Sequence, residues 1–177
     1  MLPLSLVQVP SYAVSAKPTQ PPSQLLVLGM HHAGTSIVAN LTMMLGASGG
    51  PPSDLLKHPS NPLKYFENSD VVAVDKTRLA AGVDASARYD LPKWLAYGFD
   101  ADKPATPVHQ MAEAKSIVAK LNEQRPFVTK DPRMALVASE WLPLLDAPAC
   151  VIVHRQPLSI ASSLMIYSHN VSFPALK

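Results

Sequence analysis

Charge and cysteine are scarce in this chain of 177 residues, and each shortage excludes a class of protein. Lys and Arg number 15 and Asp and Glu 13, a net charge of +2, and the basic residues form no run. A nucleic-acid partner is therefore not expected. The single cysteine, Cys150, cannot form an intramolecular disulfide. Because it lies in the apolar run of residues 149–153, we expect it to be a buried structural thiol.

Long apolar runs are also missing, since none approaches the roughly 18 residues that cross a membrane. We therefore expect no membrane span. Residues 1–24 lack a basic segment ahead of an apolar one, which argues against a secretory signal. We expect them to form a flexible extension to one domain over residues 25–177, although an organelle-targeting leader stays open because the segment lacks Asp and Glu. A soluble, cytoplasmic protein is the default expectation.

Proline, in contrast, is abundant: 18 prolines punctuate short apolar segments. Three of these segments have the length and composition of buried strands, namely residues 25–28, 126–129 and 149–153. Five others have helical periodicity, namely residues 35–46, 66–81, 108–124, 134–145 and 159–167. We expect Gly46 to end the first of these helices and Asn68 or Ser69 to cap the second. Strands that alternate with helices predict an α/β fold, a three-layer α/β/α arrangement with a short parallel sheet. Residues 84–107 show no clear pattern and are expected to be loose.

The segment Gly29-Met30-His31-His32-Ala33-Gly34-Thr35-Ser36 connects the first predicted strand to the first predicted helix. Two glycines with four residues between them, followed by hydroxyl residues that open a helix, are typical of a phosphate-binding turn. Thr35 stands where a nucleoside triphosphatase carries Lys, which disfavours an ATP-dependent kinase. Glycines that serve turn geometry alone are the alternative. The adjacent His31 and His32 point apart and have no ligand cluster near them in sequence, so no metal is expected.

Together with two later segments, this turn resembles the sulfotransferases, which transfer a sulfuryl group from 3′-phosphoadenosine 5′-phosphosulfate (PAPS). The turn resembles the family's 5′-phosphosulfate loop, and Val128-Thr129-Lys130-Asp131-Pro132-Arg133 resembles a Lys-Asp-Pro strand end. Residues 151–157, continued to 162–164, resemble the 3′-phosphate element, with Arg155 and Ser163 eight residues apart. Tyr65-Phe66-Glu67 resembles a further segment of bacterial-type members.

This resemblance implies a P-loop-like sulfotransferase half-fold and a role for each matched residue. PAPS would be held by residues 31–36, that is His31, His32, Ala33, Gly34, Thr35 and Ser36, and by Arg155 and Ser163 at the 3′-phosphate. Lys130 would offset charge on the sulfuryl and leaving oxygens. Glu67 is the candidate base for a hydroxyl or amine acceptor, a small molecule or a glycan, provided that burial raises its pKa.

Each role has a structural alternative. For Arg155 the alternative is a solvated charge at a strand end, and for Lys130 it is an ion pair with Asp131 in a loop. Glu67, just before a predicted helix, has the position of a carboxylate that stabilises a helix N-terminus.

Two departures from the family pattern bear on catalysis. The family usually carries Arg or Lys at the position of His32, which we count among the catalytic as well as the binding residues. A histidine with a pKa near 6.5 is mostly neutral at pH 7 and supplies a hydrogen bond rather than a charge. Family members also continue well beyond the 3′-phosphate helix, so the resemblance implies a missing C-terminal part. A non-catalytic nucleotide-binding or interaction module on the same fold is therefore the second hypothesis.

Overall fold

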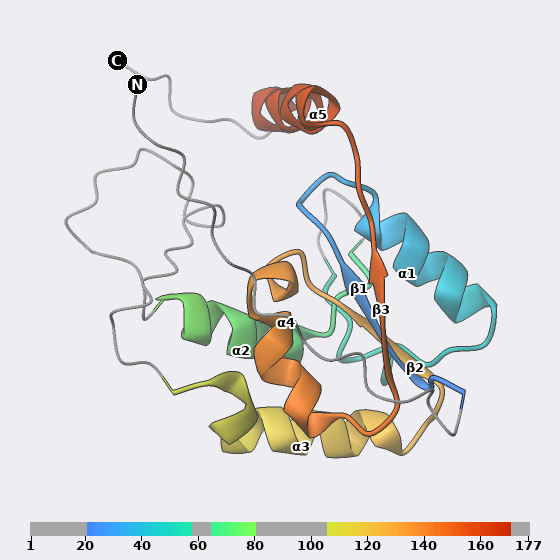
Figure 1. Ribbon diagram of the computed structural model, residues 1–177. Helices are drawn as coiled ribbons and strands as arrows, with labels where there is room; N and C mark the ends of the chain where they lie inside the picture. Colours follow the sequence, from blue (N-terminus) through green and yellow to red (C-terminus); the bar gives the residue numbers. More distant parts are fainter. Residues whose placement is uncertain (1–20, 58–64, 81–105, 171–177) are drawn as a thin grey trace, which may run out of the picture.

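The computed structural model describes residues 21–57, 65–80 and 106–170, and a parallel sheet of three strands lies at its centre (Figure 1). The strands are β1 (Gln24–Leu28), β2 (Phe127–Lys130) and β3 (Pro148–Ile152), in the order β2-β1-β3. Leu26 of β1 lies opposite Thr129 of β2 and Cys150 of β3. The protein is thus mixed α/β with a short parallel sheet, as the alternating pattern predicts.

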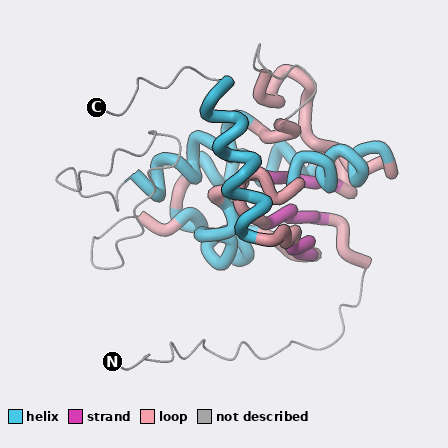
Figure 2. The backbone as a smooth tube through the Cα atoms, turned by 90° about the horizontal axis from the view of Figure 1, so that it is seen from above, coloured by secondary structure: helices cyan, strands magenta, loops and turns pink. Residues whose placement is uncertain are grey.

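Helices cover both faces of the sheet (Figure 2). They are α1 (Thr35–Met44), α2 (Ser69–Ala80), α3 (Ala112–Asn122), α4 (Met134–Trp141) and α5 (Pro157–Asn170). Successive residues of β1 point to opposite faces. Val27 packs with Ala39 of α1, whereas Leu26 packs into the larger core formed by α2, α3 and α4. Helix α5 lies beyond the carboxyl ends of the strands (Figures 1 and 2).

Several predicted helix ends are confirmed. Gly46 has a φ of 105° and its N–H donates to the carbonyl of Met43, so it ends α1. The Oδ1 atom of Asn68 accepts hydrogen bonds from the N–H groups of Asp70 (3.0 Å) and Val71 (3.3 Å), so Asn68 caps α2.

Two predicted helices are shorter than expected. Residues Val108–Gln110 form a 3₁₀ turn, and an extended Met111 separates this turn from α3. Helix α4 gives way at its end to a second 3₁₀ turn, Leu142–Leu144, which contains Pro143. Proline lacks the N–H that would continue an α-helix, so the apolar periodicity of this segment outlasts the helix itself.

Strand β3 is far more exposed than the sequence predicts. Cys150 is exposed and the side chain of Ile152 is 77% exposed, so the expectation of a buried thiol is wrong. Helices α2, α3 and α4 pack over β1 and β2, and no described helix packs on the same face of β3. Both β2 and β3 lie at an edge of the sheet, yet β2 is buried, and an apolar strand sequence does not reveal which strands the helices cover.

The first strand begins inside the segment expected to be a flexible extension. Gln24 is fully buried, and its Oε1 atom accepts hydrogen bonds from the N–H groups of Asp146 (2.9 Å) and Ala147 (2.8 Å). Its Nε2 atom donates to Oδ1 of Asn122 at 2.8 Å. The other predictions for residues 1–20, and most of the loose segment at 84–107, lie outside the described residues. In the described ranges, no helix has the length and apolar character needed to cross a membrane.

Candidate functional site

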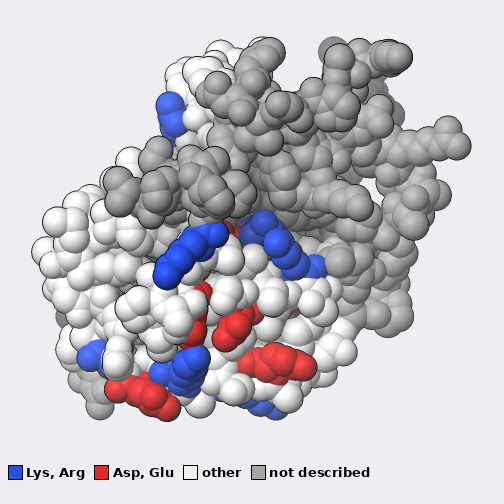
Figure 3. Space-filling model, turned by 180° about the vertical axis from the view of Figure 1, so that it is seen from behind, with Lys and Arg blue, Asp and Glu red and all other residues white. Residues whose placement is uncertain are grey.

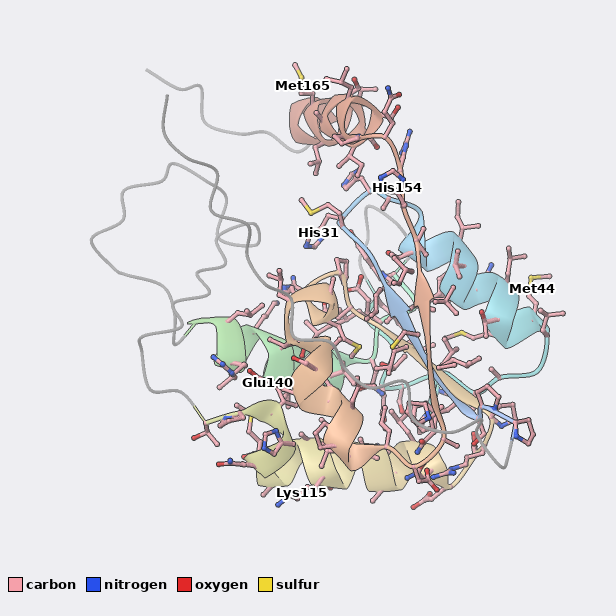
Figure 4. The ribbon with its side chains drawn as sticks, viewed as in Figure 1. His31, Met44, Lys115, Glu140, His154 and Met165 are labelled. Atoms are coloured by element: carbon pink, nitrogen blue, oxygen red, sulfur yellow. The ribbon has the colours of Figure 1, made fainter. Side chains whose placement is uncertain are left out.

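The three segments that carry the resemblance meet at one edge of the sheet. Because all three strands are parallel, the loops that follow β1, β2 and β3 leave the sheet at the same end. Figure 4 shows His31, from the loop after β1, and His154, from the loop after β3, at this end below α5. A crevice at the carboxyl ends of parallel strands is where α/β proteins commonly bind ligands.

The turn at residues 29–36 is held closely against the end of β3. A Cβ atom on Gly29 would lie 2.6 Å from the carbonyl oxygen of Val153, so only glycine fits there. The N–H of Ala33 donates to the carbonyl of Met30 at 3.1 Å and closes the turn. His32 (φ 61°) and Gly34 (φ 105°) both have left-handed backbone conformations. The glycines and His32 thus give the turn a defined shape.

The N-terminus of α1 offers hydrogen-bond donors. Gly34 precedes the helix without a side-chain cap. Within the described part of the chain, the N–H groups of Gly34, Thr35 and Ser36 have no hydrogen-bond acceptor. The side chain of Thr35 is buried beneath them. Unsatisfied N–H groups at the positive end of a helix favour an anion.

A second set of polar groups joins the turn to α5, and we call His32, Arg155 and Ser163 the open group. Arg155 Nη1 donates to the carbonyl oxygen of His32 at 3.0 Å. The Oγ atom of Ser163 lies 2.9 Å from Nδ1 of His32. Burial, followed by the charge of Arg155, lowers the pKa of His32, so the ring is mostly neutral near pH 7 in the free protein.

A hollow of about 350 Å³ opens beside the open group. Its lining residues come from the loop after β3 and from one side of α5: Arg155, Leu158, Ser159, Ser162, Ser163 and Ile166. Ser159 and Ser162 are absent from the sequence-based site. Ser159 precedes Ser163 by four residues, so the two share one side of a helix, and this spacing is the signal that could have identified Ser159.

A third set, the buried group, lies at the end of β2 and consists of Glu67, Asp75, Lys130, Asp131 and Arg133. The Nζ atom of Lys130 donates to Oε1 of Glu67, and the two side chains are only 1% and 8% exposed. Burial lowers the pKa of Lys130 although Glu67 opposes the shift. Burial likewise raises the pKa of Glu67 against the influence of Lys130.

Asp131 pairs with Arg133 rather than with Lys130. Its Oδ1 atom accepts hydrogen bonds from Arg133 Nη1 (2.7 Å) and from the Arg133 N–H (3.0 Å). The sequence-based alternative, an ion pair between Lys130 and Asp131, is therefore wrong, because Lys130 pairs with Glu67 instead. Glu67 also directs its carboxylate to Lys130, so this ion pair, and not the start of α2, accounts for its side-chain position.

Asp75 and Asp131 form a buried pair of carboxyls that the sequence does not reveal. Both are fully buried, and Trp141 Nε1 donates to Oδ1 of Asp75 at 2.8 Å. In the described part of the chain, no donor group forms a hydrogen bond with the Oδ2 atom of either residue. Burial, followed by the proximity of Asp131, raises the pKa of Asp75 well above its ordinary value. A protonated Asp75 facing Asp131 satisfies both groups.

His31 links the turn to the buried group. Burial, followed by the charges of Arg133 and Lys130, lowers the pKa of His31 to about 3. The imidazole is therefore neutral at physiological pH and too weak a base to remove the proton of an alcohol. Its available chemistry is hydrogen bonding.

The surface charges are mixed. On the face seen in Figure 3, positive and negative side chains lie next to one another. The surface ion pairs include Lys120–Asp54 (2.6 Å) and Arg125–Asp146 (2.6 Å). Within the described ranges, no three His, Cys, Asp or Glu side chains gather closely enough to hold a metal ion.

No protein-family model matches the chain, and neither a curated protein nor a solved structure matches it.

Proposed function

We propose that the protein binds PAPS, as a P-loop-like sulfotransferase half-fold, with the 5′-phosphate at the turn and the 3′-phosphate at Arg155 and Ser163. One observation carries this proposal. Arg155 and Ser163 both contact His32, which precedes them by 123 and 131 residues, respectively. Two segments that the resemblance assigns to two phosphates of one ligand are thus adjacent.

The chemistry of each position suits its proposed ligand. The N–H groups of Gly34, Thr35 and Ser36 have capacity for a phosphate, and their helix adds a favourable partial charge. Arg155 is exposed and offers a planar fork of donors, which matches phosphate oxygens. His31 and Ala33 line the same turn, and because both are neutral they do not repel the negatively charged PAPS. No metal enters this scheme, because the transferred sulfuryl group has no neighbouring outer phosphate to bridge.

The proposed reaction is sulfuryl transfer to a hydroxyl or amine of a small molecule or glycan. The acceptor oxygen or nitrogen forms a bond to sulfur, and the bond from sulfur to the 5′-phosphate oxygen breaks. Adenosine 3′,5′-bisphosphate leaves, and the acceptor's proton passes to a base. Glu67, whose raised pKa suits that role, and Lys130, which would neutralise the leaving oxygens, are the proposed groups.

A second candidate function is donor binding without transfer. The observation that favours it is the buried contact of Lys130 with Glu67, since each proposed catalytic group satisfies the other inside the protein. His32, in place of a permanently charged side chain, points the same way.

Thermal unfolding with adenosine 3′,5′-bisphosphate tests the shared part of both functions. We expect the ligand to raise Tm of the intact chain and to raise Tm of Arg155→Ala much less, because only the turn is left to bind it. Arg125→Ala is the matched control, because Arg125 pairs with Asp146 away from the site and its variant should keep the full shift. An unchanged Tm of the intact protein would contradict the proposal. Transfer of labelled sulfate to acceptors then separates the two functions.

A further inference from the structure

His32 and Ser163 share a hydrogen bond whose direction depends on a proton. Ser163 Oγ lies 2.9 Å from Nδ1 of His32 and also lines the hollow beside α5. A serine hydroxyl has one hydrogen to donate. When Nδ1 carries no hydrogen, the hydroxyl donates to the ring and has none left for the hollow. When Nδ1 is protonated, the ring donates to Ser163 and frees the serine hydrogen.

The charges around His32 make the protonation of its ring depend on whether an anionic ligand is bound. Arg155 is the positive group beside it, and His31 is its titratable neighbour in the turn. The described side chains of α1, β3 and α5 around it carry no charge. A phosphate in the hollow would therefore add negative charge beside the ring, and a nearby negative charge favours the protonated ring.

We propose that the neutral His32 ring carries its hydrogen on Nε2 and takes up a second proton, at Nδ1, from solvent when a phosphate monoester binds in the hollow, which turns the Ser163 hydroxyl toward the phosphate. This inference rests on the proposed function and deepens it, because it names what replaces a permanent cation at this position. His32 is a positioning residue that acts through Ser163. The site then provides one charge, that of Arg155, in the free protein and a second only when a dianion is present.

The first consequence is that affinity rises as pH falls. The binding constant of adenosine 3′,5′-bisphosphate is measured by calorimetry at pH 6.0 and 8.0 for the wild-type chain and for His32→Asn. Asparagine tolerates the left-handed backbone of His32 but cannot titrate. We expect the ratio of the two constants to be roughly three- to tenfold larger for wild type, since one linked proton changes affinity by up to about tenfold per pH unit. Ionisation of the ligand cancels in this comparison.

The second consequence concerns Ser163→Ala. Its loss of affinity should be larger at pH 6.0, where the serine hydrogen faces the phosphate, than at pH 8.0, where the ring holds it. His154→Asn is the matched control, because His154 is an exposed histidine on the loop after β3 and should leave the ratio unchanged. A purely structural serine would lose the same factor at both pH values.

The following outcomes would contradict the inference. A ratio equal in wild type and His32→Asn overturns it while the proposed function stands, and so does a ratio that only His154→Asn abolishes. An equal loss for Ser163→Ala at both pH values overturns the role of its hydroxyl. Failure of the bisphosphate to bind the wild-type chain at either pH overturns both this inference and the proposed function.

Discussion

The buried group and the open group lie at the ends of β2 and β3, on either side of β1, yet their cations differ in burial and in the groups that they pair with. In the buried group, Lys130 is 1% exposed and pairs with Glu67. In the open group, Arg155 is exposed and donates to a backbone carbonyl rather than to a carboxylate. A charge that the protein neutralises internally serves its structure first, whereas a cation left facing a hollow is available to an anion.

The largest expected effect comes from breaking the buried ion pair. Glu67→Ala leaves Lys130 buried without its partner, and such a loss typically costs about 3–5 kcal/mol. Chemical denaturation measures it. The double variant Glu67→Leu with Lys130→Met removes both charges and should lose much less. If Glu67→Ala cost under about 1 kcal/mol, the contrast between the two groups would fail.

Gly29 tests the packing that supports the open group. Gly29→Ala places a Cβ atom against the carbonyl oxygen of Val153, and we expect a loss of about 2–3 kcal/mol in the free energy of unfolding. Gly46→Ala is the control. Gly46 also has a positive φ, but a Cβ atom there would have no described neighbour within 4 Å, so only backbone strain of about 1 kcal/mol is expected. Equal losses would show that the approach of Gly29 to β3 is unimportant.

The carboxyl pair of Asp75 and Asp131 makes stability depend on pH. Because the folded state raises the pKa of Asp75, its contribution is complete below the unfolded pKa, about 3.9. It is lost as pH rises through the folded pKa, by at most about 1.4 kcal/mol per pH unit for one proton.

Asp75→Asn should weaken this pH dependence in denaturation curves measured from pH 4 upward. Some dependence remains, since Glu67 shifts in the same direction. An identical slope in wild type and Asp75→Asn would exclude a protonated Asp75.

The smallest expected effect on stability is that of Arg155→Ala. The side chain is exposed, and its hydrogen bond to the His32 carbonyl lies at the surface, so we expect a change within about 0.5 kcal/mol. Denaturation without ligand measures it. A loss above about 1.5 kcal/mol would make Arg155 a structural residue like those of the buried group.

Local patterns were enough to predict much of the fold. The apolar runs predicted all three strands to within one or two residues, and Asn68 and Gly46 end their helices as expected. Each of these signals depends on a few neighbouring residues, so it can be recognised in a single sequence.

The contacts that sequence could not predict are those between distant segments. Nothing near Lys130 indicates that Glu67, 63 residues earlier, is its partner, or that Asp75 approaches Asp131. Cys150 was misplaced for the same reason, because its exposure depends on which strands the helices cover. The meeting of Arg155, Ser163 and the turn was predictable only through the resemblance to a family, which supplied the long-range information.

The central claim is that the open group holds a 3′-phosphate, and the difference in affinity between two ligands tests it most directly. Calorimetry of the wild-type chain should show adenosine 3′,5′-bisphosphate binding at least about tenfold more tightly than adenosine 5′-monophosphate. A hydrogen bond to a charged group contributes about 1.5–3 kcal/mol, which corresponds to such a factor. The difference should disappear in Arg155→Ala. Equal affinities of the wild-type chain for the two ligands would contradict the claim.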